Sequence, residues 1–146
     1  MRTLKYKILL NIAAAAGYFA AGWVGTLLAT PPSNASPIWP AAGVALALML
    51  VYGNSVLPGI FLGALLAQCY AFLDISSLSK MLVSMGVGSV AAIGCCLQAW
   101  LGMWLINRYV GRHNPLIEDK KILRFFVLIA ASCLVSATVG VAYLAF

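Results

Sequence analysis

Apolar residues fill long stretches of this chain, and short segments rich in polar residues, glycine or proline separate them. Not one Asp, Glu, Lys or Arg occurs between Ile8 and Leu73. A helix needs about 20 apolar residues to cross the hydrocarbon core of a bilayer, so this part alone can cross more than twice. The pattern predicts an all-α fold, a polytopic transmembrane helix bundle that forms a single domain over residues 1–146. About five spans are expected, near residues 8–29, 38–52, 58–73, 81–106 and 122–146.

The second and third of these spans are expected to be short. Residues 38–73 carry no charge, but they are fewer than the roughly 40 residues that two full spans need. Tyr-Gly-Asn-Ser at 52–55 interrupts the run. We predict short helices near Pro40–Val51 and Pro58–Leu73, because proline suits the first turn of a helix. Whether this hairpin crosses the bilayer or only dips into the bundle stays open.

The composition fits a chain that faces lipid. Of the 146 residues 64% are apolar and 8% are charged, whereas soluble domains carry about 25% charged residues. The net charge of +6 does not indicate nucleic-acid binding, which needs a basic face on a soluble scaffold. We therefore expect the lipid bilayer, and no nucleic acid, as a partner.

The basic residues are distributed unevenly along the chain. Three precede the first span, five lie between Asn107 and Arg124, and Lys80 alone lies between the third and fourth spans. Cytoplasmic loops carry an excess of Lys and Arg. We expect a multi-pass protein of the bacterial inner membrane, with its N-terminus in the cytoplasm and Phe146 outside.

Gln98 is a polar amide inside the fourth apolar run, about 15 Å along a helix from Arg108 and so near mid-membrane. An unpaired amide is costly in hydrocarbon, so we expect it to hydrogen-bond across helices, to Ser89, Ser132 or Ser136. The alternative is a contact with a ligand, because polar groups inside a bundle often mark functional sites.

Small residues recur at every fourth position of four spans, which lets helix backbones approach closely in lipid. These stripes predict a tightly packed bundle and indicate no particular function. Their members are Ala13, Gly17, Ala21, Gly25 and Ala29; Gly59, Gly63 and Ala67; Ser84, Gly88, Ala92 and Cys96; and Ser132, Ser136 and Gly140.

Catalytic and metal-binding patterns are absent from the sequence. Its single histidine, His113, lies in a basic linker, and its three acidic residues lie outside the spans. An enzyme needs a nucleophile, a base and an orienting group in one pocket, and the four cysteines do not have the C-x-x-C spacing of a zinc site. We therefore expect a protein that is not an enzyme and has no cofactor or bound metal.

Several segments together resemble one family of sensory domains. The first group is IWPAAGVALA at 38–47, YG at 52–53 and PGIFLGA at 58–64. The second group is LQA at 97–99, LINR at 105–108, PL at 115–116, ILRF at 122–125 and SATVG at 136–140. In this order they resemble the first type of membrane-associated sensor domain, the MASE family.

The resemblance implies an integral bacterial sensory module of about eight helices, the input part of sensor histidine kinases or diguanylate cyclases. Two-component or cyclic di-GMP signalling would follow from such an output. The present chain departs from the pattern, because it carries about five spans and no output domain, and Asn54-Ser55 stands where a basic pair is expected. We expect a truncated or partial copy.

We therefore predict a sensory or regulatory membrane domain, with a small membrane transport protein or transport subunit as the alternative. Its partner would be a cytoplasmic signalling protein or a small-molecule ligand, and homo-oligomers stay open. Trp39 and Pro40 begin a helix near the outer surface, and glycines let neighbouring helices close around it. The residues expected to shape a stimulus-responsive pocket or packing seam are Trp39, Pro40, Gly43, Gly59 and Gly63, with Gln98 as a ligand contact.

Overall fold

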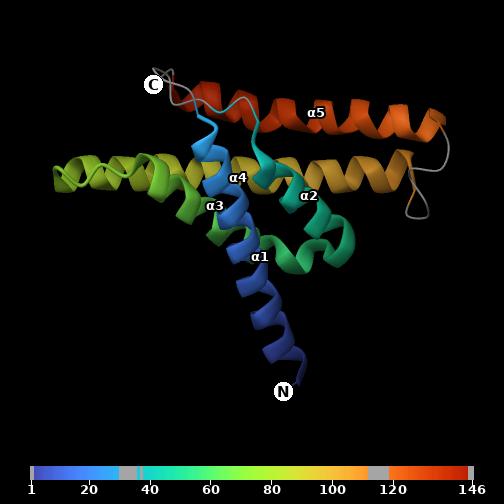
Figure 1. The fold of residues 1–146 in the computed structure, drawn as a ribbon, viewed down its shortest axis with the longest axis horizontal. Coiled ribbons are helices and arrows are strands. Elements are labelled where there is room, and N and C mark those ends of the chain that lie inside the picture. Colours follow the sequence, from blue (N-terminus) through green and yellow to red (C-terminus); the bar gives the residue numbers. More distant parts are fainter. Residues whose placement is uncertain (1, 30–35, 37, 112–118, 145–146) are drawn as a thin grey trace.

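A computed structural model describes residues 2–29, 36, 38–111 and 119–144, and every regular element in these ranges is helical (Figure 1). The predicted all-α fold is confirmed. The helices are α1 (Arg2–Leu27), α2 (Pro40–Tyr52), the short 3₁₀ helix η1 (Gly53–Val56), α3 (Leu57–Phe72), α4 (Leu78–Tyr109) and α5 (Asp119–Leu144).

The described helices include four stretches long and apolar enough to cross a membrane, and about five spans is consistent with them. These are Thr3–Leu27, Pro40–Phe72, Leu78–Tyr109 and Lys121–Thr138. The second stretch contains α2, η1 and α3. At 1.5 Å per residue, the 13 residues of α2 and the 16 of α3 measure about 20 and 24 Å, less than the roughly 30 Å hydrocarbon core. The predicted pair of short helices is therefore present.

Some helices extend a few residues beyond the predicted spans. The first helix begins at Arg2 rather than Ile8, and α4 runs from Leu78 to Tyr109 rather than over 81–106. Hydropathy marks only the part of a helix inside lipid, whereas backbone hydrogen bonding continues into the polar interface. Phe146 and the final residues of the last predicted span lie outside the described residues.

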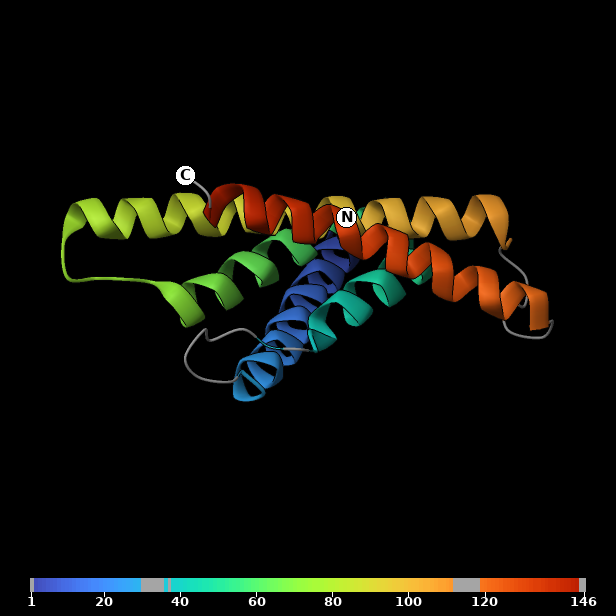
Figure 2. The same cartoon turned by 90° about the horizontal axis from the view of Figure 1, so that it is seen from above.

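The α2–α3 hairpin lies between α1 on one side and α4 on the other. Helix α1 packs against α2 and α3, and α4 packs against α2, α3 and α5. The ribbon shows α4 and α5 side by side and antiparallel, while α1 crosses them steeply in both views (Figures 1 and 2). Because α1 crosses this pair, the three long helices cannot all run along one bilayer normal.

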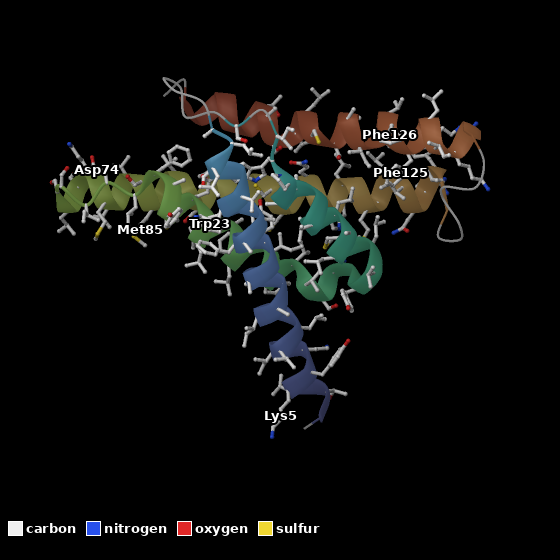
Figure 3. The ribbon with its side chains drawn as sticks, in the orientation of Figure 1. Lys5, Trp23, Asp74, Met85, Phe125 and Phe126 are labelled. Atoms are coloured by element: carbon white, nitrogen blue, oxygen red, sulfur yellow. The ribbon has the colours of Figure 1, made fainter. Side chains whose placement is uncertain are left out.

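The helix ends lie at different parts of the molecule. In Figure 1 the start of α1 lies at the bottom, and the adjoining ends of α4 and α5 lie at the upper right. The end of α3 and the start of α4 lie towards the left. Lys5 is at the free end of α1, far from Asp74 (Figure 3). Asp74 pairs with Lys80 at 3.5 Å, so the cation near the α3–α4 connection has an acidic partner.

Many core side chains are small, and most of the large apolar ones lie outside, although Tyr18, Met49 and Ile60 are fully buried. Ala14, Ala41 and Ala92 are buried, whereas Trp23 and Phe126 are 45% and 63% exposed (Figure 3). Soluble monomers rarely expose such extended apolar surface. The helices therefore pack closely and offer an apolar surface to lipid.

Helix α1 uses only the later part of its predicted small-residue stripe. Ala13 and Gly17 are exposed, whereas Gly25 is buried against Trp39. In the earlier part the neighbouring face, with Ala14 and Tyr18, is buried instead, because Tyr18 fits into the space that the glycines of α3 leave. The stripe of α3 itself, Gly59, Gly63 and Ala67, is buried as predicted.

Candidate functional site

A cavity of about 250 Å³ lies between α2, α4 and α5. It brings together three of the six residues predicted from the sequence, Trp39, Gly43 and Gln98. The chain also has a larger groove, of about 700 Å³, between α1 and α3, but it contains none of these six. The lining of the smaller cavity includes Trp39, which precedes α2, Gly43 of α2, Gln98 and Ala99 of α4, and Ser132 and Cys133 of α5.

Gln98 supplies the buried polar group of the cavity. Its side chain is 9% exposed, and its Nε2 donates to Sγ of Cys133 at 3.2 Å. The expectation of a hydrogen bond across helices is met, but the predicted serine partners were wrong. A serine hydroxyl in a helix readily bonds a carbonyl of the preceding turn. The three predicted partners do so: Ser89 donates to Met85, Ser132 to Ile129 and Ser136 to Cys133.

The other end of the Gln98 amide is its carbonyl oxygen, Oε1. Among the described residues, no donor hydrogen-bonds its Oε1. Every fully buried side-chain nitrogen or oxygen of the described residues has a hydrogen-bond partner. Because Oε1 has none, it is not fully buried and keeps accessible surface. Gln98 lines the cavity, and its carbonyl oxygen is therefore free to accept from a molecule there.

Gly43 keeps the cavity open rather than closing a helix contact. A Cβ at this position would meet no atom within 4 Å, so the prediction that Gly43 lets neighbouring helices close in was wrong. Gly43 is exposed and lines the cavity. A larger side chain here would find space, and that space belongs to the cavity and its opening.

Trp39 links the cavity to α1. It is the residue before α2 and leads into Pro40 at the first turn. A Cβ on Gly25 of α1 would lie 2.9 Å from Cε3 of the indole and 3.4 Å from Cδ of Pro40. The Tyr18 hydroxyl is also near Trp39. The ring thus lines the cavity on one side and packs on α1 on the other, with Pro40 beside it.

Gly59 and Gly63 lie elsewhere, in the contact between α1 and α3. A Cβ on Gly63 would lie 2.6 Å from the carbonyl oxygen of Ala15 and 2.8 Å from Cβ of Tyr18. A Cβ on Gly59 would overlap the carbonyl oxygen of Asn11. The six predicted residues therefore divide between a cavity and a packing seam.

Asn11 is a structural residue that the sequence analysis missed. Its Oδ1 accepts from the backbone N–H of Gly59 at 2.7 Å, and its Nδ2 donates to the carbonyls of Ser55 and Lys7 at 2.9 Å. It satisfies one of the free N–H groups at the start of α3, as a capping side chain does. The available signal was its position as an amide in an otherwise apolar run.

The cavity is suited to binding rather than to acid–base chemistry. The described residues of its lining offer an aromatic ring, an amide, a hydroxyl and a thiol, but no carboxylate, amine or imidazole. Within the described ranges, no three His, Cys, Asp or Glu side chains gather as metal ligands do. The arrangement can hold an uncharged molecule against Trp39 and Gln98.

Comparison with known proteins gives the family. The family model of MASE1 matches residues 8–146, nearly the whole chain. No curated protein and no solved structure matches it. The match agrees with the resemblance carried by the IWPAAG and PGIFLGA segments and with a multi-pass membrane domain of apolar helices. The chain therefore belongs to the MASE1 family of membrane-associated sensor domains.

Proposed function

We propose that this domain senses a stimulus at the cavity between α2, α4 and α5 and passes a change of helix packing to a cytoplasmic signalling partner. The observation that carries the proposal is the half-paired amide of Gln98, 9% exposed, in a cavity of a sensor-family domain. Polar groups inside a membrane bundle are costly and usually functional.

The sided distribution of charge supports the proposed orientation. Lys5 and Lys7 lie at the start of α1, and Arg108, Lys121 and Arg124 lie where α4 ends and α5 begins. Lys80, near the start of α4, is paired with an aspartate. We place both basic ends, the start of α1 and the adjoining ends of α4 and α5, in the cytoplasm of the bacterial inner membrane by the positive-inside rule. The N-terminus of α1 then lies in the cytoplasm.

A route from the cavity to the cytoplasm runs through α1. Trp39 contacts both the cavity and Gly25 of α1, and Asn11 ties the cytoplasmic part of α1 to the α2–α3 hairpin. A ligand that favours one position of Trp39 therefore favours one packing of α1 against the hairpin. Signalling needs only such a difference in binding free energy between two packings.

A chimera tests this function. A diguanylate cyclase domain is fused before residue 1 of the chain, and intracellular cyclic di-GMP is measured with a reporter. We expect Trp39→Ala to change the output several-fold, because the ring bridges the cavity and α1. Trp104→Ala is the matched control, since this side chain is 47% exposed and faces outward. If both variants match the parent at equal membrane levels, the proposed function is wrong.

The output itself defines the signalling class. A histidine kinase partner would place the domain in two-component signalling, and a cyclase partner would place it in cyclic di-GMP signalling. Co-purification of the full chain after crosslinking in the native membrane identifies the partner. Recovery of neither enzyme class at the basic ends of the domain would contradict this part of the proposal.

Transport is the second candidate, favoured by the pair of short helices α2 and α3. Broken helices that meet inside a bundle commonly form transporter binding sites. Uptake into vesicles that contain the purified chain distinguishes the two functions. Accumulation of a molecule that also binds the cavity supports transport, whereas binding without accumulation supports sensing.

A further inference from the structure

Among the described residues, no group that lines the cavity can neutralise a charged ligand. The described residues that line it are apolar, aromatic or uncharged polar ones. Burying an unpaired ion in a low-dielectric site is far more costly than burying a neutral molecule. An occupant must therefore be uncharged.

The lining leaves a strong hydrogen-bond acceptor without a donor. Oε1 of Gln98 has no donor among the described residues. The Ser132 hydroxyl uses its hydrogen on the carbonyl of Ile129, at 2.8 Å, and only its lone pairs remain. One hydrogen of Gln98 Nε2 is used on Cys133, so its second hydrogen and the Cys133 thiol hydrogen are donors that remain nearby. An occupant that pairs Oε1 of Gln98 must itself donate a hydrogen bond, and its own oxygen or nitrogen can accept from these donors.

The size of the cavity limits the occupant further. Its volume of about 250 Å³ is below the roughly 300–1,000 Å³ of drug-sized sites. Trp39 offers an aromatic surface, and Ala99 and Ile129 offer aliphatic ones. The absence of a side chain at Gly43 leaves room for entry. A single ring or a short alkyl chain fills such a space.

We infer that the cavity binds a small, uncharged molecule with an apolar, ring-sized body and one hydroxyl or N–H group that donates to Oε1 of Gln98. This inference rests on the proposed function in that it names the class of stimulus for the same site. Phenol is a suitable probe, and anisole is its control, because methylation removes the donor and keeps the ring.

Protection of Cys133 measures occupancy. The thiol lines the cavity and has exposed surface. It is labelled with N-ethylmaleimide, an uncharged reagent that enters the bilayer, at alkaline pH, and mass spectrometry separates it from the other cysteines. The full chain is reconstituted in vesicles, and probe concentrations are corrected for partition into protein-free vesicles. Loss of one hydrogen bond predicts that phenol protects at a concentration about 3- to 10-fold lower than anisole does.

Two substitutions decide the role of the amide. Gln98→Leu removes the acceptor and is expected to abolish the preference for phenol. Gln68→Leu is the matched control, since this glutamine packs against Gly88 outside the cavity, and it should keep the preference. The inference is overturned if phenol and anisole protect Cys133 of the wild-type chain equally well. It is also overturned if Gln98→Leu keeps the preference for phenol.

A third variant covers the case in which Gln98→Leu fails to fold. Gly43→Leu meets no atom at its Cβ and is expected to fill the cavity, so that both probes lose protection while the amide remains. Unchanged protection in Gly43→Leu refutes the site. If neither phenol nor anisole protects Cys133 but Trp39→Ala still changes the cyclic di-GMP output of the chimera, the ligand class is wrong and the sensor function stands. If the chimera is also unresponsive, the proposed function fails.

Discussion

The contact between α1 and α3 depends on the missing side chain of Gly63. Replacement by alanine places a Cβ 2.6 Å from the carbonyl oxygen of Ala15 and 2.8 Å from Cβ of Tyr18. Ordinary contact of a Cβ begins near 3.4 Å. Both obstructing atoms are fixed to the backbone of α1, so a change of rotamer cannot relieve the overlap. The two helices must move apart along the seam.

The expected cost follows from that separation. Overpacking by one methyl group in a tight core costs about 1–3 kcal/mol. A gap of 0.5–1 Å between packed surfaces also loses about a quarter to a half of the dispersion energy of each contact. Alanine is favoured over glycine in a helix by at most about 1 kcal/mol in water, which offsets only part of this. We expect Gly63→Ala to lower the free energy of unfolding by about 1–2 kcal/mol.

Unfolding in mixed micelles measures this difference. The purified chain is titrated with SDS, and tryptophan fluorescence reports the transition. Gly86→Ala is the matched control, because a Cβ there meets no atom within 4 Å and the residue is exposed. If the two variants unfold at the same SDS fraction, α1 and α3 do not approach as closely as the structure has them, and the reasoning is refuted.

Further predictions concern three polar positions. Asn11→Leu leaves a backbone N–H and a carbonyl of the hairpin unpaired and should cost about 1–3 kcal/mol in the same titration; an unchanged midpoint would contradict the capping role. Gln98→Leu should cost little, because half of its amide is unpaired and an apolar replacement is nearly neutral there; a loss as large as that of Asn11→Leu would show a purely structural amide. The hydrogen bond from the Ser76 side chain and, less strongly, that from its backbone N–H, with a smaller contribution from Lys80, hold the pKa of Asp74 below its ordinary value. The associated stability is therefore present at neutral pH and is lost as pH falls through the lowered pKa. Ser76→Ala should raise this pKa in a carboxyl NMR titration, and an unchanged value would contradict the assigned cause.

The fold class and the hairpin were predictable because they follow from run lengths and from local backbone chemistry. An uncharged run too short for two full spans, interrupted at Gly53, leads to two short helices. Gly53 has φ of +64°, a conformation that glycine adopts readily. Pro40 and Pro58 stand in the first turns of α2 and α3, where no amide hydrogen is needed.

The site was only partly predictable, because its polar contacts depend on rotation of one helix against another. Residues 132 and 133 both lie near Gln98 in the fold, and the sequence does not say which side chain the amide reaches. The hydroxyl of Ser132 bonds its own helix, which leaves the thiol. In the same way, Gly43 and Gly63 look alike in sequence, but one faces open space and the other a neighbouring backbone.

The direction of α5 gives a last test of the proposed orientation. Helices α4 and α5 are antiparallel (Figures 1 and 2), and Arg108 and Lys121 lie at their adjoining ends. If these cations are cytoplasmic, the other end of α5, at Leu144, must lie outside. Alkaline phosphatase fused at Leu144 should be active and a fluorescent protein fused there should be dark, while the same pair fused at Val110 should behave in the opposite way. A fluorescent fusion at Leu144 would mean that α5 does not cross, and the basic ends of α4 and α5 would then no longer identify the cytoplasmic side.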